Sequence, residues 1–306
     1  MPFTLYAQAR TALARDSLAG LSVGDALGAQ FYVPGRRPAD LAAGRLPDPV
    51  WEWTDDTEMA CSVFAELVRA GRVDRDALAA AFADRCEPNR GYGPGAFTVL
   101  RLIRGGTPWP VAAATAFDGQ GSLGNGAAMR VAPLGAYFAD SVTETAAQAA
   151  ASAEVTHAHP DGIAGAVAVA VAAALAARAR LDGRRPSATD LVAAVAAAVD
   201  RASPVRQGLD RAGTLVGRPV AEAAYELGNG SRVTAGDTVP FTVWVAARHL
   251  DDYPAAVRAC VEAGGDVDTT AAIAGGIVAA HTGVGTPGGV PDAWLAAREP
   301  LPDWVG

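Results

Sequence analysis

Two short segments near opposite ends of the chain each carry a pair of aspartates beside threonine hydroxyls. They read WTDDT at 53–57 and GGDVDTT at 264–270. Carboxylate and hydroxyl oxygens are the ligands that hard divalent cations prefer, and neither segment contains the histidine or cysteine typical of zinc sites. The four carboxylates of these segments are enough to hold two Mg²⁺ or Mn²⁺ ions ~3.5–4 Å apart. The pattern predicts a binuclear metal site if the fold brings the two segments together.

Helix capping is the alternative interpretation of both segments. Thr54 or Asp55 could accept hydrogen bonds from free N–H groups at the start of a helix over 55–70, and acidic residues in a first turn suit the helix dipole. A single acidic residue would be enough for a cap. Because both segments pair their aspartates, we expect metal binding in addition to capping.

A glycine-rich loop in the middle of the chain is typical of anion binding. It reads GQGSLGNGAAMR at 119–130, and its backbone N–H groups could face a pyrophosphate. The loop matches neither the Walker sequence nor the strand-preceded G-x-G-x-x-G of dinucleotide-binding folds. Gly-Asn-Gly is also an ordinary turn, and the loop alone leaves that alternative open.

A histidine-rich segment, THAHP at 156–160, stands directly before a long apolar stretch. Its two histidines could bind a metal together with a nearby carboxylate, but a capping turn is the favoured role. His249 and His281 fall at the ends of predicted helices, and we expect both to be structural.

Helical periodicity recurs from end to end and must position these segments. We predict helices over 4–21, 55–70, 75–86, 95–103, 110–117, 127–137, 143–153, 161–181, 187–201, 219–227, 239–250, 253–263 and 266–281. The proline- and glycine-rich stretch 34–49 lacks periodicity, and the two-residue alternation of strands is nearly absent. No linker divides the chain, so we expect an all-α fold with one domain over 1–306.

The composition restricts the function. Half of the 306 residues are apolar, which is enough to bury a sizeable core. The net charge of −8 and the lack of a basic cluster make double-stranded nucleic acid a poor partner. The sequence contains no lysine, which excludes Schiff-base chemistry and a P-loop lysine.

Cysteine usage and hydropathy indicate a cytoplasmic protein. The three cysteines are scattered and form no C-x-x-C pair, so neither a disulfide framework nor a thiolate zinc site is expected. The N-terminus lacks a signal pattern. The longest apolar stretch, 163–177, is shorter than the ~18–20 residues that span a bilayer, so we expect a buried core helix and no membrane.

Six segments in this order resemble the ADP-ribosyl-glycohydrolase family, whose founding bacterial member reactivates dinitrogenase reductase. They are GDALG at 24–28, WTDDT at 53–57, RGYG at 90–93, GNGAAMR at 124–130, THAH at 156–159 and GDVDTT at 265–270. The resemblance implies a single compact orthogonal helical bundle with a central binuclear Mg²⁺ or Mn²⁺ centre. The activity it implies is cleavage of the glycosidic bond between ADP-ribose and a modified protein side chain or related acceptor.

The resemblance also implies roles for individual residues. The metal ligands match Thr54, Asp55, Asp56, Asp266, Asp268 and Thr269, and either Asp55 or Asp268 could act as the general base. Substrate binding is assigned to Phe117, Gly121, Ser122, Leu123, Gly124, Asn125, His157, Tyr92 and Gly93. The expected partners are ADP-ribose and an ADP-ribosylated substrate, and we expect a monomer.

Two positions depart from the family. Many members carry a glutamate shortly after the GDALG segment, near the metal or substrate, but here the stretch reads AQFYV at 29–33. Leu123 replaces a tyrosine that stacks on the ligand in some relatives. Two other functions stay open. One is a catalytically weak ADP-ribose-binding protein, which the missing glutamate favours. The other is a two-metal phosphoesterase acting on a small nucleotide, which the glycine-rich loop and the aspartate segments would also suit.

Overall fold

The computed structural model describes residues 4–305, and the all-α prediction is confirmed. Within this range, β-type pairing is limited to three isolated bridges. The helices are α1 (Ala7–Ala29), α2 (Pro38–Ala42), α3 (Asp55–Ala70), α4 (Arg75–Arg85), α5 (Pro94–Arg104), α6 (Trp109–Ala114), α7 (Ala116–Gly119), α8 (Ala132–Tyr137), α9 (Val142–Glu154), α10 (Pro160–Leu181), α11 (Ala188–Ala197), α12 (Pro204–Thr214), α13 (Val220–Leu227), α14 (Ala235–Arg248), α15 (Tyr253–Ala263), α16 (Val267–Thr282) and α17 (Asp292–Ala297), with 3₁₀ turns η1 (Gln30–Tyr32), η2 (Pro88–Arg90), η3 (Asn125–Ala127) and η4 (Asp303–Val305).

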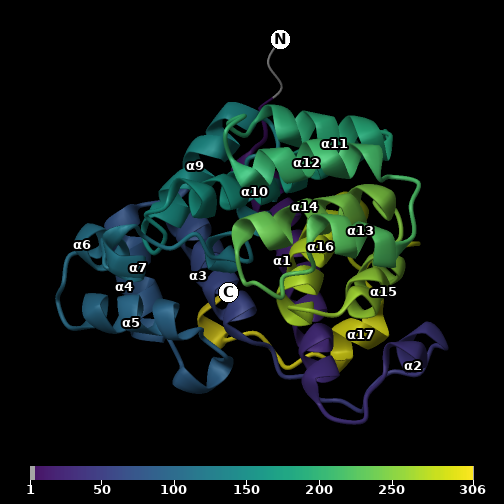
Figure 1. Ribbon diagram of the computed structural model, residues 1–306, viewed down its shortest axis with the longest axis horizontal. Coiled ribbons are helices and arrows are strands. Elements are labelled where there is room, and N and C mark those ends of the chain that lie inside the picture. Colours follow the sequence, from purple (N-terminus) through teal and green to yellow (C-terminus); the bar gives the residue numbers. More distant parts are fainter. Residues whose placement is uncertain (1–3, 306) are drawn as a thin grey trace.

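Helices α1 and α16 form the central pair, although they come from opposite ends of the chain (Figure 1). Gly20, Gly24 and Gly28 recur every four residues on the face of α1 that meets α16. A Cβ atom at Gly24 would lie 2.2 Å from the carbonyl oxygen of Ala271, and one at Gly28 would lie 2.7 Å from that of Val267. The two helices approach this closely because these positions have no side chain.

The other helices surround this pair in two groups (Figure 1). Helix α10 packs on α8, α9, α14 and α16, and α11 and α12 cover α14. Helices α4 to α7 form the second group, which lies on the left of Figure 1 next to α3. Most of the buried apolar side chains form one contiguous cluster from Leu5 to Val305. The single domain over 1–306 stays a prediction from the sequence.

Helix α10 is the most apolar long helix of the described chain. Its 22 residues, with a mean hydropathy of 1.9 over the most apolar 18-residue window, would be sufficient to cross a membrane by length and composition alone. In the structure 67% of its most apolar window is buried by neighbouring helices, as expected of the predicted core helix.

The structure corrects several predicted elements. Helix α1 continues through the GDALG segment to Ala29, because packing against α16 outweighs the low helix propensity of glycine. Helices α2, α12 and α17 were not predicted. Helices α2 and α17 are short, and tertiary contacts stabilise such helices more than their local sequence does. Helix α12 carries an apolar stripe of Val205, Leu209 and Ala212, so its periodicity was an available signal.

The glycine contact between α1 and α16 generates a stability prediction. Gly24→Ala should lower the free energy of unfolding by at least ~2 kcal/mol, because its methyl group must displace the α16 backbone. Gly213→Ala is the matched control, since a Cβ there would meet only Val192 Cγ1 at 4.0 Å. The control should be neutral or stabilising by up to ~1 kcal/mol. Urea unfolding measures both, and equal stability of the two variants would contradict the prediction.

Candidate active site

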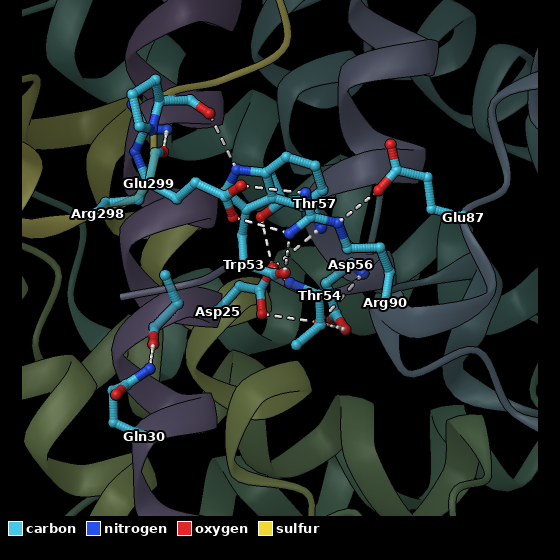
Figure 2. Close-up of polar contacts among 12 residues, drawn as sticks. Asp25, Gln30, Trp53, Thr54, Asp56, Thr57, Glu87, Arg90, Arg298 and Glu299 are labelled. Atoms are coloured by element: carbon cyan, nitrogen blue, oxygen red, sulfur yellow. Dashed lines mark hydrogen bonds and ion pairs between the residues drawn. The ribbon is translucent and has the colours of Figure 1, made fainter. Parts of the chain in front are cut away.

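Asp25, in the buried part of α1, fixes the start of α3. Its Oδ2 accepts hydrogen bonds from the backbone N–H groups of Thr54 (2.9 Å) and Thr57 (3.1 Å) and from the Thr57 hydroxyl (2.5 Å). Its Oδ1 accepts the Thr54 hydroxyl at 2.8 Å. Figure 2 shows Asp25 beneath this turn. One carboxylate thus anchors the N-terminus of α3, where Thr54 also caps the helix by accepting the Asp56 N–H.

The α1–α16 contact brings the second aspartate segment to the same place. Asp25, Asp56 and Asp268 present carboxylate oxygens that all lie within 4.8 Å of one another. The Thr269 hydroxyl is 3.4 Å from Asp56 Oδ2, which joins the first turn of α16 to that of α3. The two segments that the sequence places more than 200 residues apart therefore meet.

The cluster concentrates negative charge in a buried site. Burial raises the pKa of Asp25, Asp55, Asp56, Asp266 and Asp268. Repulsion from neighbouring carboxylates raises the pKa further at Asp55, Asp56, Asp266 and Asp268, and the pKa of Asp266 reaches about 7. Asp56 Oδ1 is buried without a hydrogen-bond partner among the described residues 4–305. An all-oxygen donor set with an unpartnered carboxylate oxygen fits a hard divalent cation.

Tyr32, at the end of η1, lies directly over the second aspartate segment. Its hydroxyl accepts the Val267 N–H at 2.9 Å and lies 2.8 Å from Asp268 Oδ1 and 3.3 Å from Asp266 Oδ1. Burial and these two carboxylates raise the pKa of Tyr32, so the phenol stays neutral and donates. The stretch 29–33, where the resemblance led us to expect a glutamate, therefore carries a side chain in contact with the cluster.

The glycine-rich loop lies beside the cluster and is tied to it. Asn125 Nδ2 donates to Asp266 Oδ2 at 2.7 Å and to the Thr238 hydroxyl at 3.1 Å. The loop is held by backbone pairing, in which Asn125 N–H donates to Val233 O at 3.1 Å and Ala235 N–H donates to Leu123 O at 3.0 Å. The structure thus places the glycine-rich loop beside the carboxylate cluster.

The other residues predicted to bind substrate border this loop or the cluster. The Ser122 hydroxyl accepts the Gly124 N–H at 3.1 Å, and a Cβ atom at Gly121 would lie 2.7 Å from His159 N. Phe117, near the start of the loop, is 60% exposed and adopts a φ of +52°. The exposed ring is available to a ligand. The left-handed conformation of its backbone is a strained one for a residue other than glycine.

Tyr92 and Gly93 lie on the α3 side of the cluster. The Tyr92 hydroxyl is within 2.5 Å of Glu58 Oε2, so the phenol is already engaged, whereas Gly93 is exposed. Arg90 holds this segment by stacking on Trp53, with its guanidinium 3.4 Å from the ring centre. Figure 2 shows the Arg90 guanidinium at the Trp53 ring, with its carboxylate partners Glu299 and Glu87 on opposite sides.

Two site residues were not assigned from the sequence. Asp25 was seen only as part of the GDALG segment, although a charged residue within an apolar, glycine-spaced helix was an available signal. Tyr32 was considered only as a departure from the family. The cavity of 770 Å³ between α12, α13 and α14 is not lined by the aspartate cluster, so cavity size alone would not have found the site.

The raised pKa values predict how cation binding depends on pH. At pH 6 Asp266, with a pKa of about 7, is largely protonated, so Mg²⁺ must displace a proton to bind. We expect the Mg²⁺ affinity to rise at least about tenfold from pH 6 to pH 8.

Calorimetric titration at both pH values, in buffers that report proton release, measures this effect. Asp48→Asn, at an exposed carboxylate outside the cluster, should leave the pH dependence unchanged. A Mg²⁺ affinity that is constant or falls as the pH rises would rule out the assignment.

Comparison with known proteins agrees with this geometry. A profile described as ADP-ribosylglycohydrolase matches residues 7–305. The chain is 29% identical to mouse ADP-ribosylhydrolase ARH3 over 93% of its length and 87% of the mouse protein, and 28% identical to the human protein over 93% and 88%. It is also similar to a solved structure described as an ADP-ribosylglycohydrolase-related protein complex, with a TM-score of 0.65, 26% identity and coverage of 95% and 94% of the two chains. The chain therefore belongs to the ADP-ribosylglycohydrolase family.

Proposed function

We propose that this protein is a metal-dependent hydrolase that cleaves the glycosidic bond between ADP-ribose and a modified protein side chain or related acceptor, and releases ADP-ribose. The observation that carries the proposal is the hydrogen bond of 2.7 Å between Asn125 and Asp266. It joins a loop suited to a diphosphate to a carboxylate cluster suited to divalent cations.

Two Mg²⁺ or Mn²⁺ ions are the proposed cofactors. Their ligands would be Thr54, Asp55, Asp56, Asp266, Asp268 and Thr269, and Asp25, which shares the cluster, would support Thr54 and Thr57. When bound, such ions orient sugar hydroxyls and lower the pKa of a water ligand. The absence of a histidine or cysteine ligand in the cluster favours these ions over zinc.

Asp55 is the better placed of the two candidate general bases. Its carboxylate accepts no side-chain or backbone hydrogen bond from another residue within 4–305, whereas Asp268 Oδ1 is bonded to the Tyr32 hydroxyl and the Thr269 N–H. Burial and neighbouring carboxylates also raise the pKa of Asp55. A carboxylate with a raised pKa accepts a proton from water more readily near neutral pH.

The loop from Gly121 to Asn125, with Ser122, would hold the diphosphate of ADP-ribose, and Phe117 would cover the ligand from the start of the loop. Gly93 would border the ligand from the α3 side. The ADP-ribosylated partner, a monomeric state and a cytoplasmic location stay predictions from the sequence.

A weakly catalytic ADP-ribose-binding protein is the second candidate. The observation that favours it is the hydrogen bond from the neutral Tyr32 phenol to Asp268. Tyr32 lies in the stretch where the resemblance led us to expect a glutamate. Such a protein would bind ADP-ribose but hydrolyse its conjugates slowly, because general acid–base help is typically worth ~10²–10⁴-fold.

An assay of the released product tests the proposal. With Mg²⁺ and arginine- or serine-linked ADP-ribose, the protein should release free ADP-ribose and no phosphate. ADP-ribose should also raise the melting temperature more than AMP does, because only ADP-ribose engages the distal ribose site. Equal stabilisation by both ligands, or release of phosphate, would overturn the glycohydrolase assignment. Asp268→Ala is the inactive control and should stay folded, since it removes a repelling buried carboxylate.

The contact of Tyr32 with the cluster gives a second prediction. The wild-type protein should hydrolyse selectively, favouring linkages whose leaving group needs little protonation, and Tyr32→Glu should widen the substrate range. Tyr32→Phe is the matched control, because it removes the hydroxyl without supplying a carboxylate, and Phe31→Glu tests the neighbouring register. The affinity for ADP-ribose should change little in each variant.

Comparison of hydrolysis rates on arginine- and serine-linked substrates decides this prediction. Wild-type rates on both substrates that equal those of relatives with the glutamate would contradict it. Another carboxylate in the 29–52 stretch, such as Glu52, would then supply the proton transfer.

A further inference from the structure

Arg130, the last residue of the glycine-rich segment 119–130, is a fully buried cation without a carboxylate partner among residues 4–305. Its Nη2 donates to the carbonyl oxygen of Ser152 at 2.7 Å and to the Thr156 hydroxyl at 3.0 Å, and its guanidinium lies 4.4 Å from the centre of the Phe82 ring. No ion pair within residues 4–305 involves Arg130. A guanidinium can only donate, so the Thr156 oxygen must accept from it.

Because the Thr156 oxygen accepts from Arg130, the Thr156 hydroxyl also determines the protonation of His157. The Thr156 hydroxyl oxygen is 2.8 Å from His157 Nδ1. If Nδ1 carried a proton, Thr156 would accept twice, and its own proton would have no acceptor among the described residues around this buried side chain. An unsatisfied buried donor is costly. The hydroxyl therefore donates to His157 Nδ1, and Nδ1 is unprotonated.

The other ring nitrogen of His157 faces the glycine-rich loop. Cβ atoms built on Gly124 and Gly126 would lie 3.5 and 3.4 Å from Nε2, and one on Gly162 would lie 3.2 Å from Cδ2 on the other side of the ring. Within the described chain no hydrogen bond uses Nε2. Burial and the charge of Arg130 lower the pKa of His157 to about 3, so the ring is neutral. A neutral ring with a bare Nδ1 carries its proton on Nε2.

We propose that Arg130 and Thr156 are positioning residues that hold His157 in the Nε2–H tautomer and so aim a neutral hydrogen-bond donor at the anion bound in the glycine-rich loop. The binding of an anion in this loop, the diphosphate of ADP-ribose, rests on the function proposed above, whereas the tautomer of His157 does not. Arg130 does not reach the loop itself in this arrangement. It acts through the Thr156 hydroxyl, and the tautomer of His157 is the observable consequence.

Nitrogen-15 spectra of the histidine rings in the ligand-free protein test the tautomer directly. The chain has four histidines, and a His157→Asn variant assigns the signal. We expect Nε2–H in the wild-type protein and in Thr156→Ser, which keeps the hydroxyl. In Thr156→Val we expect the Nδ1–H form to appear, and we expect the dissociation constant for ADP-ribose to rise roughly tenfold as the donor is lost.

Thr145→Val is the matched control, because Thr145 is another buried threonine whose hydroxyl bonds only backbone carbonyls, those of Phe138 and Ser141. It should change neither the tautomer nor the affinity. An Nδ1–H tautomer in the wild-type protein overturns the proposal even if Thr156→Val does not fold. An Nε2–H tautomer that persists in folded Thr156→Val, or an ADP-ribose affinity unchanged when the tautomer switches, also overturns it. Absence of hydrolysis by the wild-type protein would instead count against the proposed function and leaves the tautomer result intact.

Discussion

The close approach of α1 and α16 is the contact on which the rest of the site depends. Gly20, Gly24 and Gly28 leave the face of α1 without side chains, so the α16 backbone lies where Cβ atoms would otherwise be. This approach brings Asp25 in α1 next to Asp268 in the first turn of α16. Ordinary helix pairs are ~8–10 Å apart, and a wider spacing would separate the carboxylates that a shared cation needs.

The same contact has an electrostatic cost. It buries several carboxylates together, and burial and repulsion raise their pKa values. Thr54, Thr57, Asn125 and Tyr32 donate hydrogen bonds that compensate part of this charge. In the part of the chain that the structure describes, Asp56 Oδ1 still has no hydrogen-bond partner. A bound cation would supply the missing compensation, so we infer that cation binding and the stability of the central helix pair are coupled.

The proposed anion side of the site is built on a different principle. In that proposal the glycine-rich loop and the neutral imidazole of His157 bind the anion, and the charge of Arg130 is kept inside the protein. Asn125 is the direct link between the two sides, since its amide bonds Asp266 while its backbone belongs to the loop. In such an arrangement the loop could bind the diphosphate of a substrate while the cation site binds the neighbouring ribose.

The sequence alone determined the local features of this protein. Helices α3 and α15 begin and end at the predicted residues, because their caps and periodicity are contained within the segments themselves. The two aspartate segments, the glycine-rich loop and the family resemblance were likewise evident as local patterns. Only the tertiary structure decided that α1 continues to Ala29, that Asp25 anchors α3 and that Tyr32 contacts Asp268. Each of these depends on contacts between residues far apart in the chain, whose energies are not encoded in the periodicity or propensity of any single segment.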